Sequence, residues 1–137
     1  MHTTNYYNTF IQIAEDSPVN NAEVPPLKGE DKTIANLQFE MIVDNPYKYT
    51  SDDVIFHAYS VKKKITGKTA LTSARETFFS KGQACLRASP LTKRYGWGIH
   101  HDANGKVAVY PADSVAYKRF TKDKTLKQLK GMRSKRE

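Results

Sequence analysis

The segment from Cys85 to Asp102 holds the densest group of chemically active side chains in this sequence. It combines a thiol, basic and hydroxyl side chains, two histidines and the only tryptophan of the chain. Guanidinium groups pair with phosphates and carboxylates, and an aromatic ring can stack on a bound molecule. We therefore expect this segment to bind a small anionic ligand that carries a phosphate or a carboxylate. The residues expected to bind it are Arg87, Ser89, Lys93, Arg94, Tyr95, Trp97 and His100.

Two side chains of this segment are candidates for catalysis. His100 is suited to proton transfer at neutral pH, and Cys85 is suited to nucleophilic attack if a histidine lies close to it. A basic neighbour such as Arg87 would favour the reactive thiolate. A lone cysteine is also among the residue types most often buried as packing, and that alternative stays open. The sequence does not decide whether the protein is an enzyme.

Neither a metal nor another cofactor is expected. His100 and His101 are adjacent, and adjacent residues of a strand point to opposite faces, so they do not easily bind one ion. His2 and His57 lie far away in the sequence, and Cys85 is the only cysteine. The chain therefore shows no recognised spacing of metal ligands.

Residues 95–101 and 106–110 are predicted to form a β-hairpin, because the Asn104-Gly105 pair between them is a strong turn signal. Alternation along the first strand places Gly96, Gly98 and His100 on one face and Trp97 on the other. A strand face that carries glycines leaves room for close approach. A ligand groove with His100 at its rim would use that room, but we favour a helix packed on the glycines.

If the hairpin loop has two or four residues, Val107 and Val109 lie on the glycine face of the hairpin, and Ala108 and Tyr110 lie on the Trp97 face. The remaining elements follow from hydrophobic spacing and turn residues. We predict strands at 5–15 and 83–88, helices at 32–43, 51–64, 70–79 and 113–120, a loop at 16–31, a turn at 89–91 and a basic helix or tail at 125–137. The spacing at 32–43 fits a strand as well as a helix, and we favour the helix.

These elements predict a single α+β domain, 1–137, with a small, mainly antiparallel sheet and helices packed on it. At the start of the 51–64 helix, Ser51 is the expected N-cap. The carboxylates of Asp52 and Asp53 complement the dipole of the first turn. We prefer this structural explanation of the two acids to a catalytic one.

The net charge of +8 is unevenly distributed. Residues 1–86 carry 9 basic and 10 acidic side chains, whereas residues 87–137 carry 13 and 4. The alternative function is therefore a binding module for nucleic acid or an acidic protein through the basic C-terminal third, although no nucleic-acid motif is present. Removing 125–137 is expected to abolish such binding and to leave the fold intact. The basic residues concerned are Lys118, Arg119, Lys122, Lys124, Lys127, Lys130, Arg133, Lys135 and Arg136.

A cytoplasmic location is expected by elimination. A single cysteine cannot form an intrachain disulfide, and the N-terminus lacks the basic start and apolar run of a secretion signal. No window is apolar enough for a membrane span, so no membrane partner is predicted. The oligomeric state is not predicted.

Three segments of the chain resemble a family of small bacterial proteins that is classified only as a domain of unknown function. They are Met1–Tyr6, Asn45-Pro46-Tyr47 with Thr50–Val54, and Arg87–Asp102, of which Ser89–His101 is the most specific. The resemblance extends over nearly the whole chain. It implies a stand-alone cytosolic protein, and it supplies no activity, cofactor or catalytic residue.

Overall fold

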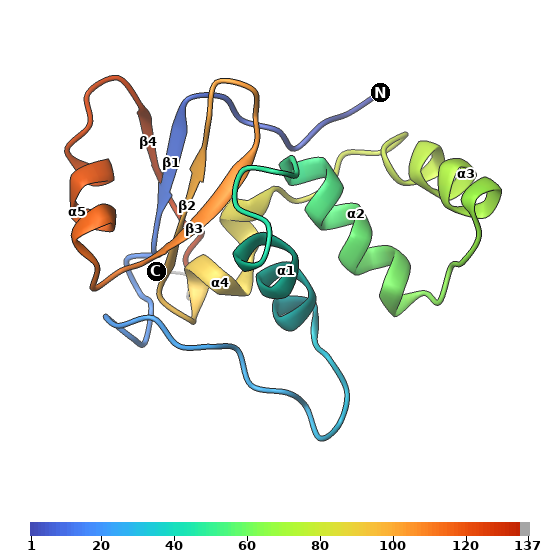
Figure 1. Cartoon of the computed structure of the whole chain (residues 1–137), viewed down its shortest axis with the longest axis horizontal. Coiled ribbons are helices and arrows are strands. Elements are labelled where there is room, and N and C mark those ends of the chain that lie inside the picture. Colours follow the sequence, from blue (N-terminus) through green and yellow to red (C-terminus); the bar gives the residue numbers. More distant parts are fainter. Residues whose placement is uncertain (135–137) are drawn as a thin grey trace.

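The computed structural model describes residues 1–134 and has the α+β architecture expected from the sequence (Figure 1). A short 3-10 turn, η1, spans Leu86–Ala88. The helices are α1 (Ile34–Val43), α2 (Ser51–Lys62), α3 (Lys68–Phe78), α4 (Pro90–Lys93) and α5 (Val115–Thr121). The strands are β1 (Thr9–Gln12), β2 (Trp97–His101), β3 (Val107–Pro111) and β4 (Lys127–Lys130).

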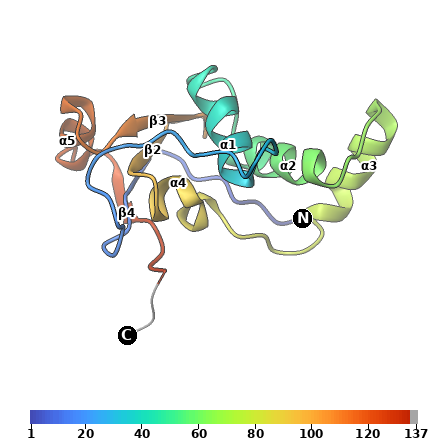
Figure 2. The ribbon, with the colours of Figure 1, turned by 90° about the horizontal axis from the view of Figure 1, so that it is seen from below.

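The four strands form one mixed sheet in the order β3-β2-β1-β4. β3, β2 and β1 pair antiparallel, and β4 pairs parallel to β1. α5 packs on one face of this sheet, and α1 and α4 pack on the other (Figures 1 and 2). α2 lies beside α1, and α3 lies beyond α2 at the end of the molecule opposite α5 (Figure 2). No helix within residues 1–134 has the length and apolar character needed to cross a membrane.

The hairpin predicted around Asn104-Gly105 is present, but its loop has three residues, whereas we considered loops of two or four residues. The Asp102 N–H donates to the Lys106 carbonyl at 2.9 Å, which leaves a three-residue loop ending at Gly105 with a φ of 78°. An odd loop length exchanges the faces of the returning strand.

The expected assignment of the β3 side chains to faces is therefore wrong. Val109 pairs with Ile99 and Val107 with His101, so both valines lie on the Trp97 face, whereas Ala108 lies on the Gly98 face. The helix that we favoured over the glycines is present at Gly98, which is covered by α5, but not at Gly96. A Cβ at Gly96 would lie 2.6 Å from the Asn21 carbonyl oxygen, which belongs to the loop expected at 16–31. A Cβ at Gly98 would lie 2.6 Å from atoms of both the Phe10 and the Tyr117 rings.

The main core lies between the other face of the sheet and the helices α1, α2 and α4. Period-two alternation turns at least one apolar side chain of each strand toward these helices. Leu129 of β4 pairs with Ile11 of β1 in the sheet and packs against the same core. The buried residues of this hydrophobic core are Ile11, Phe39, Ile42, Val54, Leu86, Leu91, Ile99 and Val107.

Three predicted elements differ from the structure. The strand expected at 83–88 is instead an irregular segment that ends in η1, and the turn expected at 89–91 is the start of α4, where Pro90 takes the first helical position. The strand expected at 5–15 is ordered as strand only over β1. The basic helix or tail expected at 125–137 contains β4, because Leu129 has a core position to occupy, and 135–137 lie outside the described residues.

The cap of α2 is Thr50 rather than Ser51. The Thr50 hydroxyl accepts from the Asp53 N–H, and the Asp53 carboxylate accepts from the Thr50 N–H, which forms a reciprocal capping box. Ser51 is buried instead, where its hydroxyl bonds to that of Thr4 at 2.8 Å. The helix predicted at 32–43 is confirmed as α1, with an equivalent box at its own start.

Candidate ligand-binding site

The residues expected to form one anion site lie in several different environments. Ser89 is buried and caps α4, and its hydroxyl donates to Gln38 Oε1 at 2.6 Å. Trp97 Nε1 donates to the Glu23 carbonyl at 2.8 Å, and the Glu23 N–H donates to the Tyr95 carbonyl. These contacts hold the segment around Glu23 against β2, so the polar groups of Ser89 and Trp97 serve the fold.

Arg87 faces the edge of the sheet that is formed by β4. Its Nε donates to the Lys130 carbonyl at 2.7 Å, and its own carbonyl accepts from the Met132 N–H. Arg87 thereby fastens the chain after β4, and it borders a shallow hollow of about 450 Å³ shared with Lys130 and Arg133. Glu15 lies in the same hollow and pairs with Lys130 at 2.9 Å.

Lys93 and Arg94 follow each other where α4 ends. Lys93 is the last residue of the helix and is partly exposed, and Arg94 is its exposed C-cap. Neither position brings a cation to His100, which lies on the opposite face of the sheet under α5.

His100 belongs to a hydrogen-bonded group of rings on the α5 face. The Tyr47 hydroxyl bonds to His100 Nδ1 at 2.8 Å and to the Tyr110 hydroxyl at 2.7 Å. The Phe120 ring of α5 stacks on the imidazole with 4.4 Å between centroids. Burial lowers the pKa of His100, and burial together with the Tyr110 bond raises the pKa of Tyr47. His100 is therefore neutral at pH 7, and its Nδ1 is engaged by the phenol.

Tyr47 is a member of this group that sequence reasoning missed. Its φ of 59° lies in the left-handed region, which is uncommon for a residue with a side chain. The Tyr47 N–H donates to the Val107 carbonyl at 2.9 Å, which holds the backbone in this conformation. The Asn45-Pro46 pair directly before Tyr47 is a turn signal, but nothing in the sequence places the Tyr47 ring beside His100.

Cys85 lies on the other side of the sheet, beside Tyr6. Its Sγ is 3.3 Å from the Tyr6 hydroxyl, and the Tyr6 ring meets the edge of His101 with 5.5 Å between centroids. Burial and the bond to Cys85 raise the pKa of Tyr6 to about 12. A phenol with that pKa does not act as a base at neutral pH, so this pair lacks the activated base that a cysteine nucleophile needs.

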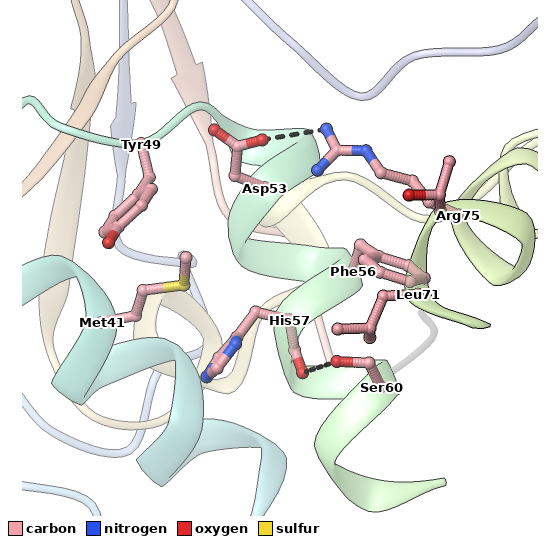
Figure 3. A pocket seen from close by; sticks show the side chains of 9 residues that line it. Met41, Tyr49, Asp53, Phe56, His57, Ser60, Leu71 and Arg75 are labelled. Atoms are coloured by element: carbon pink, nitrogen blue, oxygen red, sulfur yellow. Dashed lines mark hydrogen bonds and ion pairs between the residues drawn. The ribbon is translucent and has the colours of Figure 1, made fainter. Parts of the chain in front are cut away.

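A different hollow brings together polar groups that the sequence analysis had not combined. It measures about 400 Å³ and opens between α1, α2 and α3 (Figure 3). We call it the Arg75 hollow. Its lining residues are Met41, Tyr49, Asp53, Phe56, His57, Ser60, Leu71, Thr72 and Arg75.

Arg75 extends from α3 toward α2, where it contacts a carboxylate and two aromatic rings. Its Nη2 pairs with Asp53 Oδ1 at 2.9 Å, and its guanidinium carbon lies 5.8 Å from the Phe56 ring centroid and 5.6 Å from that of Phe79. Partial burial opposes ionisation of Asp53, but hydrogen bonds from Thr50 and Arg75 hold its pKa below the usual range. The ion pair therefore persists through the neutral pH range.

The remaining walls of the Arg75 hollow combine hydroxyls, an imidazole and apolar surface. Figure 3 shows His57 on the α2 side with its ring directed toward Met41, and Leu71 between Phe56 and Ser60. The Ser60 hydroxyl donates to the His57 carbonyl at 2.9 Å, which leaves its oxygen lone pairs as acceptors. A small molecule with an apolar body and a polar end matches this lining.

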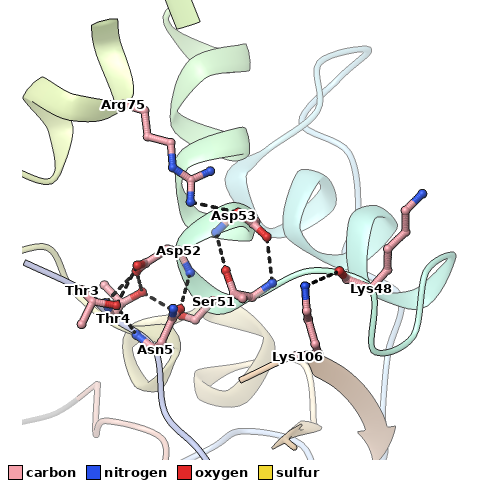
Figure 4. A network of polar contacts seen from close by, with 10 residues as sticks. Thr3, Thr4, Asn5, Lys48, Ser51, Asp52, Asp53, Arg75 and Lys106 are labelled. Atoms are coloured by element: carbon pink, nitrogen blue, oxygen red, sulfur yellow. Dashed lines mark hydrogen bonds and ion pairs between the residues drawn. The ribbon is translucent and has the colours of Figure 1, made fainter. Parts of the chain in front are cut away.

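The N-terminal segment fixes the first turn of α2 beside the hollow. Asp52 accepts from the Thr3 hydroxyl and from the Thr4 N–H, both at 2.7 Å, and the Asp52 N–H donates to Asn5 Oδ1 (Figure 4). Asp52 therefore binds the N-terminus, and Asp53 binds Arg75. The two adjacent acids have separate structural partners.

One sequence signal was available for this site. Asp53, His57 and Ser60 are spaced four and three residues apart, which places them on one face of a helix. Asp53 was assigned to helix capping alone, and His57 was set aside as distant from the other histidines. Arg75 gave no comparable signal, because its place depends on how α3 folds back on α2. Within the part of the chain that the structure describes, no three histidine, cysteine or acidic side chains converge as a metal site would require.

The family model described as "Family of unknown function (DUF6157)" matches residues 1–137. The chain belongs to this family, as the resemblance of its sequence had indicated. No curated protein matches the chain. No solved structure matches it either.

Proposed function

We propose that this protein binds a small anionic ligand, carrying a carboxylate or a phosphate, in the Arg75 hollow. The observation that supports this proposal most directly is that one concave, partly apolar surface is lined by Arg75, His57 and Thr72. A volume of about 400 Å³ lies in the range of small-molecule sites. The class of ligand is the one expected from the sequence, and the place is different.

The guanidinium supplies the principal anion contact in this proposal. Within residues 1–134 a single guanidinium nitrogen, Nη2, is ion-paired, and a guanidinium has five N–H donors. The rings of Phe56 and Phe79 hold the group in place, which reduces the conformational entropy lost on binding. Asp53 offsets the positive charge, so we expect moderate affinity and a ligand whose apolar body contacts Met41 and Leu71.

The segment 87–102 supports a ligand site less well. Ser89 is buried, Trp97 is bonded to Glu23, and Arg87 is bonded to the Lys130 carbonyl. These groups face different parts of the molecule, so they do not offer a common contact to one small anion.

Calorimetric titration with benzoate and with benzylamine tests the proposal. Benzoate should bind saturably, and benzylamine, which has a similar shape and the opposite charge, should bind at least tenfold more weakly. Thr72→Phe fills the hollow from an exposed position and should abolish benzoate binding. Ser73→Phe is the matched control, because Ser73 is an adjacent, exposed α3 residue that does not line the hollow. Equal benzoate binding by both variants would contradict the site.

A second candidate function is supported by the charge of α5 and β4. Residues 115–134 contain seven basic side chains and one acidic side chain, and all seven basic residues are exposed. Such a surface attracts nucleic acid or an acidic protein. Truncation is not the clean test expected from the sequence, because β4 contributes Leu129 to the core.

Point substitutions replace the truncation. If the surface binds single-stranded nucleic acid, Lys118→Gln and Lys122→Gln should each lower the slope of log K against log salt by about 0.7. Lys62→Gln, which removes an equal charge from α2, should leave the slope unchanged. An oligonucleotide affinity that does not vary with salt would rule this candidate out.

We also place the protein in the cytoplasm. Cys85 is a free thiol among the described residues, and free thiols persist in reducing compartments. Cell fractionation with an antibody tests this location directly.

A further inference from the structure

A second hollow lies on the other side of α2 and differs in chemistry from the Arg75 hollow. It measures about 390 Å³ and opens between α1, α2 and the end of α3. We call it the Tyr59 groove. Its lining residues are Ile34, Gln38, Ile55, Ala58, Tyr59, Lys62, Lys63 and Phe78. At 3.6 residues per turn, the α2 residues of the two hollows lie on opposite sides of the helix.

The floor of the Tyr59 groove is apolar. Ala58 is fully buried at its base, and the Tyr59 and Phe78 rings lie 4.5 Å apart between centroids. Ile34 stands at the rim with 37% of its surface exposed. Gln38 contributes the only amide side chain of this lining, and its Oε1 accepts a hydrogen bond from the Ser89 hydroxyl. Such a surface favours a hydrocarbon chain.

The charged groups of the groove are both cationic. Lys62 and Lys63 are exposed at the C-terminal end of α2, where the helix dipole favours their charge. Lys62 Nζ lies 3.1 Å from the Lys32 carbonyl, and Lys64 follows directly. Glu40, on the neighbouring α1, is paired with Lys32 at 2.8 Å. An apolar floor with ammonium groups at one end is complementary to a chain that ends in an anion.

We propose that the Tyr59 groove binds an anionic amphiphile with one alkyl chain, of which a straight-chain carboxylic acid is the simplest. The chain lies on Ile55 and Phe78, and the carboxylate meets the ammonium groups of Lys62 and Lys63. The complementary charge selects this occupant over a neutral hydrocarbon or a cation. The inference is independent of the proposed function, because the two sites share no lining residue.

A chain-length series tests the apolar part of the proposal. Hexanoate, octanoate and decanoate are titrated below their micelle concentrations, and binding is followed by the methyl signals of Ile34, Ile55 and Ala58. Each added methylene should lower Kd about fourfold, the factor that corresponds to about 0.8 kcal/mol per buried CH₂. Octylammonium, equal in length to octanoate, should bind at least tenfold more weakly. A Kd that does not depend on chain length or head-group charge would overturn the proposal.

Two pairs of variants locate the site. Ile34→Glu places a carboxylate at the rim and should raise the octanoate Kd more than tenfold, whereas Val61→Glu, at an exposed apolar position outside the groove, should not. Lys63→Gln should weaken octanoate severalfold, and Lys68→Gln should not. Equal effects within either pair would contradict the proposal. So would protein that sediments with phosphatidylglycerol vesicles but does not bind octanoate, since the occupant would then be a membrane surface.

Discussion

At the scale of single residues, His101 has the most constrained environment. Its side chain is fully buried at the start of the hairpin turn, against the edge of Tyr6. The backbone of Ile99 and of Thr9 lies near the ring, but within residues 1–134 neither ring nitrogen makes a hydrogen bond of acceptable geometry. Desolvation by burial therefore dominates, and it lowers the pKa of His101 to about 4. His101 is neutral in the folded protein at pH 7.

This residue makes a prediction for stability against pH. Unfolded His101 binds a proton below its ordinary pKa of about 6.5, and folded His101 does so only near 4, so the free energy of unfolding falls as pH drops from 6.5 to 4. The loss assigned to this group is about 3 kcal/mol. His101→Phe should remove that part of the pH dependence in urea titrations, and His57→Ala should not. Parallel curves for wild type and His101→Phe would contradict this assignment.

Gly98 is a second residue whose identity is set by its neighbours. The Phe10 and Tyr117 rings occupy the space of a Cβ, and Gly98 has no positive φ that would otherwise explain a glycine. Gly98→Ala should lower the free energy of unfolding by about 1–3 kcal/mol through overpacking. Gly82→Ala is the control, since a Cβ there meets only His2 Nδ1 at 3.9 Å. Comparable urea midpoints for the two variants would show that α5 does not pack on Gly98 as described.

At the scale of elements, Asp52 connects the N-terminal segment to α2. Asp52→Ala removes the acceptors of Thr3 and Thr4 and should cost about 1–3 kcal/mol of stability, because Thr4 is buried. Amide exchange at Thr4 should accelerate more than exchange in β2. Glu76→Ala, at an exposed acid of α3, should change neither quantity. Unchanged protection at Thr4 in Asp52→Ala would contradict the role of this carboxylate.

Elements with strong local signals were predictable from the sequence. Asn104-Gly105 located the hairpin, and Thr50 to Asp53 located the start of α2 to within one residue. The loop length was not predictable, because two-, three- and four-residue loops are all common. β4 was missed because Lys127 and Lys130 are exposed, so the segment resembles a basic tail. Its parallel pairing with β1 joins residues more than a hundred positions apart, which no local pattern reports.

The candidate site was less predictable than the fold for a related reason. The chemically dense segment 87–102 is contiguous in sequence, but its side chains turn to different faces of the sheet and to different partners. The Arg75 hollow joins residues from α1, α2 and α3, and its central contact between Asp53 and Arg75 depends on the path of the chain between two helices. The packing of the three helices brings these groups together, and the composition of a sequence segment does not reveal that packing.

At the scale of the whole molecule, the proposed binding surfaces lie at opposite ends. The sheet and the basic α5 form one end, and α2 with α3 forms the other, as Figures 1 and 2 show. Residues 1–86, which precede the basic C-terminal third, carry 9 basic and 10 acidic side chains and are therefore nearly neutral in net charge. Binding of small anions in the Arg75 hollow should therefore depend weakly on salt, whereas binding to α5 and β4 should depend on it steeply.

The most direct test of the central claim is the Nε–Hε signal of Arg75, followed by NMR while benzoate is added. The account predicts a saturable shift of this signal together with the Leu71 methyls, retained at 0.2 M salt in Ser73→Phe and lost in Thr72→Phe. Shifts that fail to saturate, or that appear at Lys118 and Lys122 while Arg75 stays unchanged, would contradict a ligand site in the Arg75 hollow.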